Sequence, residues 1–405
     1  MKNKSGSTNL LFLALFLLSL VYSLFSYSLT DPNLVISSWT PYWNFQQWMW
    51  QTFFHNPQLM SKAYLALVVG FFTIYLLGFK KLKNIKPAQL FGKLLLALSP
   101  LFFSYNALSH DVFNYMFNAK MVTLFKVDPH VKVALDFYFD EWTRFMHNTH
   151  TPAPYGYGWT IFSVIPYLAG FHKFLPTWII FKLLSWASYI ALFFSLKNIS
   201  EKISNKKISA QAIWLVFANP LIFIEILSNL HNDLWMLVPA VVSLNLIIKK
   251  PKKNLVLKTV LSLFLLFFSI STKLATVVLL PFWIYWFTKL FMENKKPFNW
   301  FEKLEKIFPF FISLALFLPL LTPRSQQFLP WYLSWSLIWL PFINNKLWKY
   351  WILCLSFTGL IRYIPWMLAS GFEGSVIADQ KVVVWLGAIA LLIITQLFSL
   401  RKKKN

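Results

Sequence analysis

Residues 209–249, SAQAIWLVFANPLIFIEILSNLHNDLWMLVPAVVSLNLIIK, contain the pattern that decides the fold. Two apolar stretches flank the short polar segment NLHND at residues 229–233. A helix of roughly twenty apolar residues is long enough to cross a bilayer core of about 30 Å. The segment therefore predicts two membrane-spanning helices joined by a tight turn, with Glu225 inside the first of them.

The same alternation recurs along the chain. Of the 405 residues, 57% are hydrophobic and 13% are charged, about half the charged share that is usual for a soluble domain. This composition excludes a soluble enzyme, a disordered chain and a peripherally anchored protein. We expect one integral membrane domain over residues 1–405, an all-α polytopic bundle with about twelve spans, at 9–28, 60–79, 90–108, 175–196, 209–228, 232–249, 255–271, 274–291, 307–321, 329–343, 347–365 and 382–399.

The distribution of Lys and Arg predicts the orientation. The net charge is +24, and the basic residues gather at 80–86, 197–207, 249–258, 289–306, 346–349 and 401–404. Such clusters favour the cytoplasmic side, so both termini are expected there, in a multi-pass protein of a prokaryotic plasma membrane. The short apolar stretch 159–172 must then be a re-entrant or interfacial helix. Loops 29–59 and 109–174 form the expected active-site face outside. Anionic membrane lipid is a secondary partner for the basic clusters, and no nucleic acid is expected.

The end of the third expected span contains an acid of interest in the segment SHDVFNY, residues 109–115. Asp111 stands at the mouth of that span, where partial desolvation should raise its pKa toward that of a useful general base. His110 and Tyr115 flank it as candidate binding residues. The alternative is that Ser109 or Asp111 merely caps the helix that follows.

The polar segment quoted first is the second candidate. Glu225, Asn229 and Asn232 are spaced to share one helical face, and His231 and Asp233 complete the cluster. A tight outer turn would explain the Asn and Asp residues alone, but a Glu at membrane depth points to function. Two His and Asp ligands are weak evidence for metal, so no cofactor is certain and a divalent metal ion is possible.

Cations and aromatic residues on the outer side form the third candidate. Lys273 and Arg324 either extend to the interface or bind a phosphate. Trp331 and Tyr332 either anchor the chain at the interface or stack against a sugar. The chain has no Gly-rich phosphate loop, and the inner loops offer no nucleotide pocket. An activated sugar donor would therefore arrive on a lipid.

These motifs together resemble the GT-C-type glycosyltransferases, and among them the polyprenol-phosphate-mannose-dependent mannosyltransferases. The similarity extends over residues 105–335 and depends on the order of short motifs. These are SHD with Tyr115, the element Asp128-Pro129-His130, the turn PYGYG at 154–158 that includes Tyr155, the NPL…E…HND pattern at 219–233, STK at 271–273 and PWY at 330–332.

The resemblance implies a reaction. A polyprenyl-phosphate sugar, mannose or another hexose, would be transferred with inversion to a glycan or lipid-glycan acceptor on the outer face. Asp111 would deprotonate the acceptor hydroxyl, and Lys273, Arg324 and His231 would stabilise the leaving phosphate. Asp233 would orient His231. The alternative is a transporter or flippase for a lipid-linked or anionic solute, against which the lack of internal repeats argues.

Overall fold

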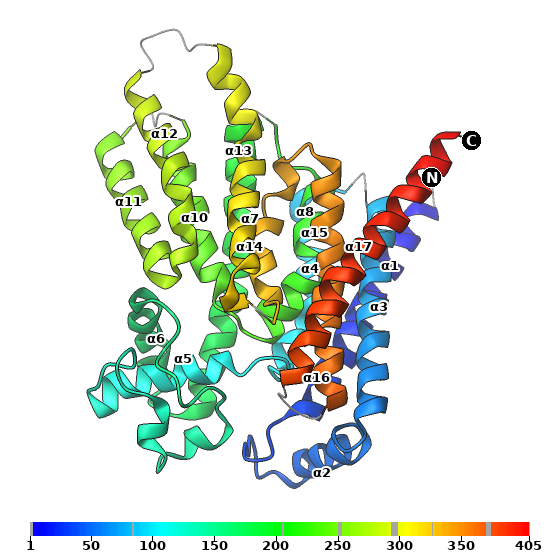
Figure 1. Cartoon of the computed structure of the whole chain (residues 1–405), viewed down its shortest axis with the longest axis vertical. Coiled ribbons are helices and arrows are strands. Elements are labelled where there is room, and N and C mark those ends of the chain that lie inside the picture. The colour runs from blue at the N-terminus through cyan, green and yellow to red at the C-terminus, as the bar shows by residue number, and fades with distance from the viewer. Residues whose placement is uncertain are drawn as a thin grey trace.

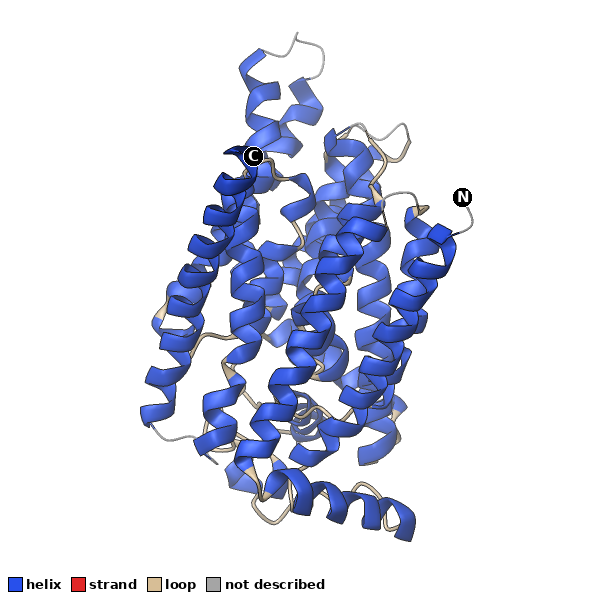
Figure 2. Cartoon of the chain, turned by 90° about the vertical axis from the view of Figure 1, so that its right-hand side faces the viewer, coloured by secondary structure: helices blue, strands red, loops and turns tan. Residues whose placement is uncertain are grey.

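The computed structural model describes residues 3–82, 85–204, 206–249, 253–292, 299–325, 327–369 and 374–404. Parts of the basic segments 80–86, 197–207, 249–258 and 289–306 lie outside this range. Every regular element in the described residues is a helix (Figure 2), so the all-α prediction is confirmed.

The structure contains long helices and many short helical turns. The α-helices are α1 (Asn3–Ser26), α2 (Thr40–Met49), α3 (Pro57–Lys81), α4 (Pro87–Leu98), α5 (Asp111–Lys120), α6 (Tyr157–Ala169), α7 (Phe174–Ser204), α8 (Ala210–Phe217), α9 (Pro220–Ile222), α10 (Asp233–Ile247), α11 (Leu255–Thr272), α12 (Leu280–Met292), α13 (Asn299–Phe317), α14 (Leu333–Leu337), α15 (Lys346–Ile361), α16 (Tyr363–Ala369) and α17 (Gly374–Lys404). Turns of 3-10 helix lie at Tyr27–Leu29, Ser99–Phe103, Ala134–Phe137, Glu141–Phe145, Leu274–Leu279, Leu318–Leu321, Pro323–Ser325, Pro330–Tyr332 and Leu340–Phe342, and π-helical turns lie at Trp50–Phe54, Met121–Phe125 and Phe223–Ser228.

The helices differ from the expected spans mainly in length. Within the described residues, seven helical segments are long and apolar enough to cross a membrane, and a bent pair makes an eighth. Three further expected spans form apolar helices of 10–17 residues, at Pro87–Phe103, Asp233–Ile247 and Leu274–Leu290. The expected span at 329–343 is instead a run of short buried helical turns. Pro330 begins the first of these turns, where proline is tolerated, and α14 ends four residues before Pro341, because proline lacks the amide hydrogen that a continuous helix needs.

The long helices run side by side, and short elements gather at one end of the bundle (Figure 1). Helices α2, α5 and α6 lie at the end opposite the two chain termini. The segments 29–59 and 109–174 therefore lie at the same end of the bundle. Helix α6 has 13 residues and is about 20 Å long, shorter than the bilayer core.

The bent pair is built by the Asn-Pro motif. The Asn219 side chain accepts a hydrogen bond from the backbone N–H of Leu221 at 3.0 Å, and Pro220 begins the next helix. Asn is a favoured N-cap and Pro a favoured first helical residue. The chain therefore breaks and bends by 49° between Ala210–Phe217 and Pro220–Ser228. A π-helical turn over Phe223–Ser228 follows and places Glu225 inside the protein. Such turns are frequent at functional sites.

Candidate active site

Asp111 is the first residue of α5 and belongs to a buried polar cluster. Ser109 Oγ accepts a hydrogen bond from the Asp111 backbone N–H at 3.3 Å, so Ser109 supports the helix start. The Asp111 carboxylate itself is directed at His231, with Oδ2 at 3.3 Å from Nδ1. The side chain of Asp111 is 20% exposed, whereas that of His231 is fully buried. Asp111 therefore connects the buried cluster with the surface.

His231 lies between two carboxylates. Its Nε2 is 3.3 Å from Glu225 Oε2, on the opposite edge of the ring from Asp111. Only a doubly protonated imidazole has a donor for each carboxylate. Burial alone would lower the pKa of His231, but the close contacts and negative charges of Asp111 and Glu225 outweigh it and raise this pKa to about 9. His231 is therefore a cation at neutral pH.

The pKa of Asp111 is lowered, so the rise expected from its place at the mouth of a span is wrong. Burial would raise it, but the hydrogen bond and charge of His231, the charge of Lys273 and a hydrogen bond from Tyr155 hold it below its usual range. Asp111 is therefore ionised at neutral pH, with its carboxylate able to accept a proton.

Glu225 is fully buried and has three partners. Its Oε1 accepts a hydrogen bond from the Tyr363 hydroxyl at 2.9 Å, and its Oε2 accepts one from Asn229 Nδ2 at 3.3 Å. The third partner is His231. Asn229 also accepts a hydrogen bond from the backbone N–H of Leu108 at 3.1 Å, which ties the segment before α5 to this turn. The contact agrees with the predicted shared face of Glu225 and Asn229, whereas the prediction that Asn232 shares this face is wrong, because the helical turn ends at Ser228 and Asn232 is the N-cap of α10.

Asp233 binds a different cation from the one expected. Its Oδ1 accepts from Lys273 Nζ at 2.9 Å and from Trp335 Nε1 at 2.5 Å. The prediction that Asp233 orients His231 is therefore wrong, since the carboxylates beside His231 belong to Asp111 and Glu225. Asp233 is the first residue of α10. Its side chain points toward Lys273 at the end of α11 and toward Trp335 in α14.

Aromatic rings form one wall of the cluster. The Trp331 ring stacks on His231, with centroids 3.8 Å apart and an interplanar angle of 18°. Tyr332 stacks on Trp335 at 4.1 Å, and Lys273 Nζ lies 5.6 Å from the Tyr332 ring centroid. This wall excludes water from the charged groups, which strengthens the interactions between them.

The turn PYGYG docks against the STK motif. Gly156 donates its backbone N–H to the carbonyl of Thr272 at 3.0 Å. A Cβ at Gly156 would lie 1.9 Å from the Ser271 carbonyl oxygen, so only glycine fits this close approach. The contact places Tyr155 beside the cluster. Arg324, an exposed residue, donates through Nη2 to the Pro154 carbonyl at 2.6 Å and so lies at the rim.

Several buried polar atoms of the cluster have no hydrogen-bond partner among the described residues. They are Nδ2 and Oδ1 of Asn232, Oδ2 of Asp233, and both ring nitrogens of His231, whose contacts with Asp111 and Glu225 are ion pairs at 3.3 Å. The backbone N–H of Asn232 donates to the Tyr115 hydroxyl at 3.4 Å, so Tyr115 faces the same turn. An unsatisfied buried polar group costs about 1–3 kcal/mol, and a polar ligand would supply the missing partners.

Two predicted site residues lie elsewhere. The His110 ring faces Phe145, Tyr105 and His147 rather than the cluster. Asp128 is exposed, accepts a hydrogen bond from the Tyr157 hydroxyl at 2.9 Å, and lines a surface groove of about 420 Å³ together with Tyr157.

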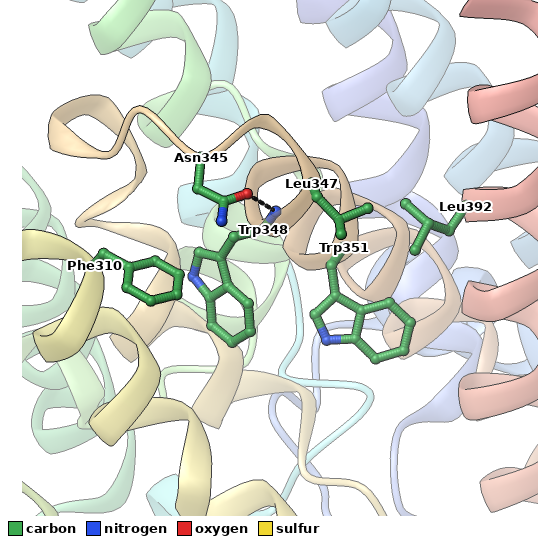
Figure 3. A pocket seen from close by; sticks show the side chains of 6 residues that line it. All are labelled: Phe310, Asn345, Leu347, Trp348, Trp351 and Leu392. Carbon is green, nitrogen blue, oxygen red and sulfur yellow. Dashed lines mark hydrogen bonds between the residues drawn. The ribbon is translucent and has the colours of Figure 1, made fainter. Parts of the chain in front are cut away.

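A second cavity lies away from the cluster. It has about 240 Å³ and is lined by apolar side chains of α13, α15 and α17, with Asn345 as its polar member (Figure 3). The Asn345 side chain accepts from the Trp348 backbone N–H at 3.0 Å and so caps α15. This cavity contains no group suited to acid–base chemistry.

Sequence reasoning missed two residues of the cluster. Tyr363 was not singled out, because it lies 138 residues beyond Glu225 in a stretch that reads as an ordinary apolar span. Trp335 lies at the end of the aromatic segment 329–335, in which only Trp331 and Tyr332 are predicted binding residues. Arg362, directly before Tyr363, belongs to the same set of outer cations as Lys273 and Arg324, and this cation is the signal that points to this part of the chain.

The assembled cluster can be compared with known proteins. The profile of the family described as alpha-(1→6)-mannopyranosyltransferase, N-terminal domain, matches residues 33–289. This is more than half of the chain. The chain belongs to this family. No curated protein and no solved structure matches it.

Membership makes the chain a glycosyltransferase of a GT-C-type mannosyltransferase family. The matched range contains the ionic residues Asp111, Glu225, His231, Asp233 and Lys273. Trp331, Trp335 and Tyr363 follow the matched range, yet they contact its residues directly. The cluster thus combines side chains from both parts of this mannosyltransferase family chain.

Proposed function

We propose that the chain transfers mannose or another hexose from a polyprenyl-phosphate donor to a hydroxyl of a glycan or lipid-glycan acceptor, with inversion. The observation that carries this proposal is the exposure of Asp111. Glu225 and Asp233 are fully buried, whereas Asp111 keeps an open side. Asp111 is therefore the carboxylate of the cluster that an acceptor hydroxyl can reach.

In the proposed step the acceptor oxygen attacks the anomeric carbon of the donor. The bond between that carbon and the phosphate oxygen breaks, and its electron pair leaves with the polyprenyl phosphate. The acceptor hydroxyl proton passes to Asp111. Direct displacement inverts the anomeric centre, and a second carboxylate nucleophile is not needed because phosphate already leaves well.

The developing phosphate charge requires positive groups nearby. Lys273 supplies an ammonium group held by Asp233 at 2.9 Å, and Arg324 supplies a guanidinium at the rim. The His231 imidazolium is shared between two carboxylates, so its main role is to fix Asp111, and it reaches the phosphate only as a further positive charge. Asn232, with its unpaired buried amide, is suited to bind a sugar hydroxyl.

We propose that the reaction takes place at the outer face of a prokaryotic plasma membrane, with both termini cytoplasmic. The clustering of α2, α5 and α6 opposite the termini supports this orientation. Because Trp331 and Tyr363 contact His231 and Glu225, we also propose that residues 1–405 act as one domain. The prenyl tail of the donor would lie in the surrounding membrane lipid.

The decisive experiment is a transfer assay in membranes with a panel of radiolabelled polyprenyl-phosphate sugars. Wild type should use the mannosyl donor, and Asp111→Asn should not. Asp136→Asn, a change in an exposed acid of the same loop, serves as the matched control and should keep full activity. Transfer from a nucleotide sugar without any lipid donor would reject the proposal.

The orientation has its own test. Single cysteines are introduced as Asp128→Cys or His150→Cys in a Cys354→Ser background. Both positions are exposed in the 109–174 segment, so an impermeant thiol reagent should label them in intact cells. Labelling only after lysis would place the active site inside and remove the argument for a lipid-borne donor.

A further inference from the structure

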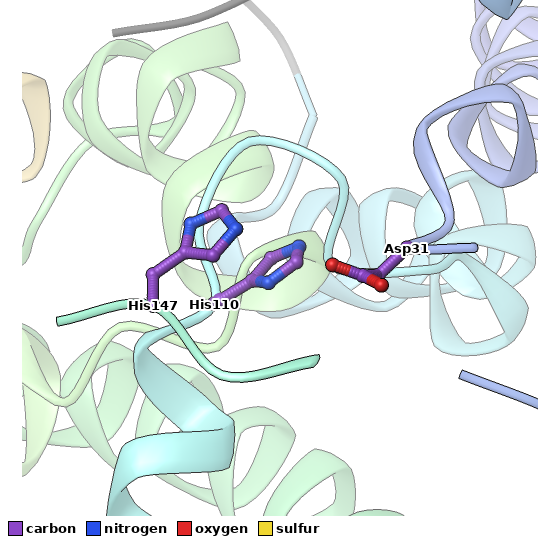
Figure 4. Close-up of side chains that lie close together, drawn as sticks. All are labelled: Asp31, His110 and His147. Atoms are coloured by element: carbon purple, nitrogen blue, oxygen red, sulfur yellow. The ribbon is translucent and has the colours of Figure 1, made fainter. Parts of the chain in front are cut away.

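Three side chains from separate segments converge beside the N-terminus of α5. They are Asp31, which follows the first helix, His110, which precedes α5, and His147, which lies between α5 and α6. One potential ligand atom of each lies within 4.8 Å of those of the other two. Figure 4 shows the Asp31 carboxylate directed toward the two imidazole rings.

The hydrogen bonds of His110 fix which ring nitrogen carries the lone pair. Its Nδ1 is 3.0 Å from the Phe145 carbonyl oxygen, and because a carbonyl only accepts, Nδ1 must carry the hydrogen. Nε2 then holds the lone pair and faces the Tyr105 hydroxyl at 3.3 Å. A histidine that donates one N–H to a backbone carbonyl and presents the other nitrogen is the usual arrangement of a metal ligand.

The other two groups complete a plausible donor set. The rings of His110 and His147 stack with centroids 3.9 Å apart, which is unfavourable if both are protonated, since like charges repel. Asp31 Oδ1 accepts hydrogen bonds from the backbone N–H and side-chain Nδ2 of Asn33, at 2.8 and 3.1 Å. These bonds orient the carboxylate and leave its second oxygen for another partner.

We propose that Asp31, His110 and His147 bind a divalent transition metal ion of the zinc class. Two imidazole nitrogens and one carboxylate oxygen suit Zn²⁺, with water in the fourth position. Ligands bound at about 2.0–2.1 Å in a tetrahedron lie roughly 3.4 Å from one another. The side chains must therefore close by up to about 1.4 Å, and one of the two stacked rings must turn so that both lone pairs meet at the ion. The ion would displace the Tyr105 hydroxyl from His110 Nε2.

Such a site would cross-link two loops that are far apart in the sequence. Asp31 belongs to the first expected outer loop, and His147 belongs to the second. His110 is the residue directly before Asp111, so the ion would hold the start of α5 in place. Asp31, His110 and His147 would therefore position the proposed base without touching the substrate. Metal binding itself does not depend on the proposed reaction.

The test uses the full chain in detergent, purified through a tag without histidine and stripped with a chelator. Co²⁺ is titrated in and followed by its visible d–d absorption, and bound Zn²⁺ is counted by mass spectrometry. Wild type should bind one equivalent of either metal. Loss of a ligand by His147→Ala should weaken binding by more than the 10–100-fold that outer-shell changes typically cost. His150→Ala removes an exposed histidine three residues away and should bind as wild type does.

The shift in melting temperature on adding Zn²⁺ provides a second measure of metal binding, which remains valid when a variant is less stable than wild type. Zn²⁺ should raise the melting temperature of wild type and His150→Ala, because a ligand that binds the folded state stabilises it. It should leave that of His147→Ala unchanged, and Asp31→Asn should show a reduced shift. If wild type binds no Co²⁺, or if His147→Ala binds it equally well, the cluster is a stacked imidazole pair and the proposal is wrong.

Discussion

Two tyrosines in this protein make the same bond in opposite surroundings. Tyr363 donates to Glu225 at 2.9 Å, and Tyr157 donates to Asp128 at 2.9 Å. The first pair is buried and joins residues 138 positions apart, whereas the second is exposed and joins residues 29 positions apart. Equal distances therefore conceal different energies, since an exposed bond replaces one that water would make equally well.

The difference extends to the acids themselves. Asp128 lies in an exposed loop and accepts from the backbone N–H of His130 at 2.8 Å, as an acid in an ordinary turn does. Asp111 is the first residue of α5 and not its N-cap, which is His110, and its carboxylate is paired with a buried imidazole. Both acids belong to motifs of the same family resemblance. Their surroundings suit Asp111 to catalysis and Asp128 to a supporting role in the surface groove.

The largest expected effect comes from Asp111→Asn. This change preserves shape but removes the proton acceptor, so activity should fall by at least about 10²-fold. Asp128→Asn should change activity only a few-fold, because that carboxylate is solvated. Initial rates of mannosyl transfer in membranes measure both.

The contrast between Asp111 and Asp128 is wrong if Asp128→Asn loses activity and Asp111→Asn keeps it. An active Asp111→Asn protein together with an inactive Asp128→Asn protein would move the chemistry to the surface groove. Size-exclusion chromatography in detergent checks that each variant remains folded. Asp136→Asn again provides the matched exposed acid.

The same contrast explains what the sequence could predict. Local spacing predicted that Glu225 and Asn229 share a helical face, and the hydrogen bond between them agrees. It did not predict that Asp233 would turn to Lys273, because that contact depends on how α10 packs against α11. Tyr363 could not be predicted, because its contact with Glu225 joins residues 138 positions apart and local sequence patterns carry no information about such a contact.

The spans show the same division. Runs such as 60–79 and 382–399 are predicted well, because a long apolar helix can be recognised from its length and composition alone. The run 329–343 is apolar too but is broken into short turns that pack inside the bundle. Hydropathy alone cannot separate a buried segment of protein from one that faces lipid, and the helix end before Pro341 is a local feature that a hydropathy window does not register.

The second prediction concerns His231. Replacing it by Ala removes the cation shared by Asp111 and Glu225, so the partly exposed Asp111 and the buried Glu225 lose their common partner. We expect a fall of about 10–10²-fold in kcat/KM, because a misplaced base is costly even when it is present. Asp233→Asn should show a smaller defect that appears mainly in KM for the donor, since it loosens Lys273. Normal donor kinetics in both variants would reduce residues 229–233 to a connecting turn.

The pH dependence tests the charge state of the same residue. The folded-state pKa of His231 is raised from 6.5 to about 9, so its contribution to stability is complete below pH 6.5 and is lost as the pH rises through about 9. Wild-type kcat/KM should therefore fall above about pH 9, together with thermal stability. In His231→Gln, which cannot titrate, this alkaline loss should disappear. An unchanged alkaline limb in that variant would assign it to another group.

The smallest expected effect on activity returns to the two tyrosines. Tyr363→Phe removes one of three partners of a buried carboxylate, while Asn229 and His231 remain beside Glu225. A buried hydrogen bond to a charged group contributes about 1.5–3 kcal/mol, so the melting temperature should fall clearly and activity only a few-fold. Tyr157→Phe removes a bond of equal length at the surface and should change neither quantity measurably. Equal shifts in melting temperature for the two variants would show that burial does not set the strength of these bonds, and the contrast between the cluster and the surface groove would then have no energetic basis.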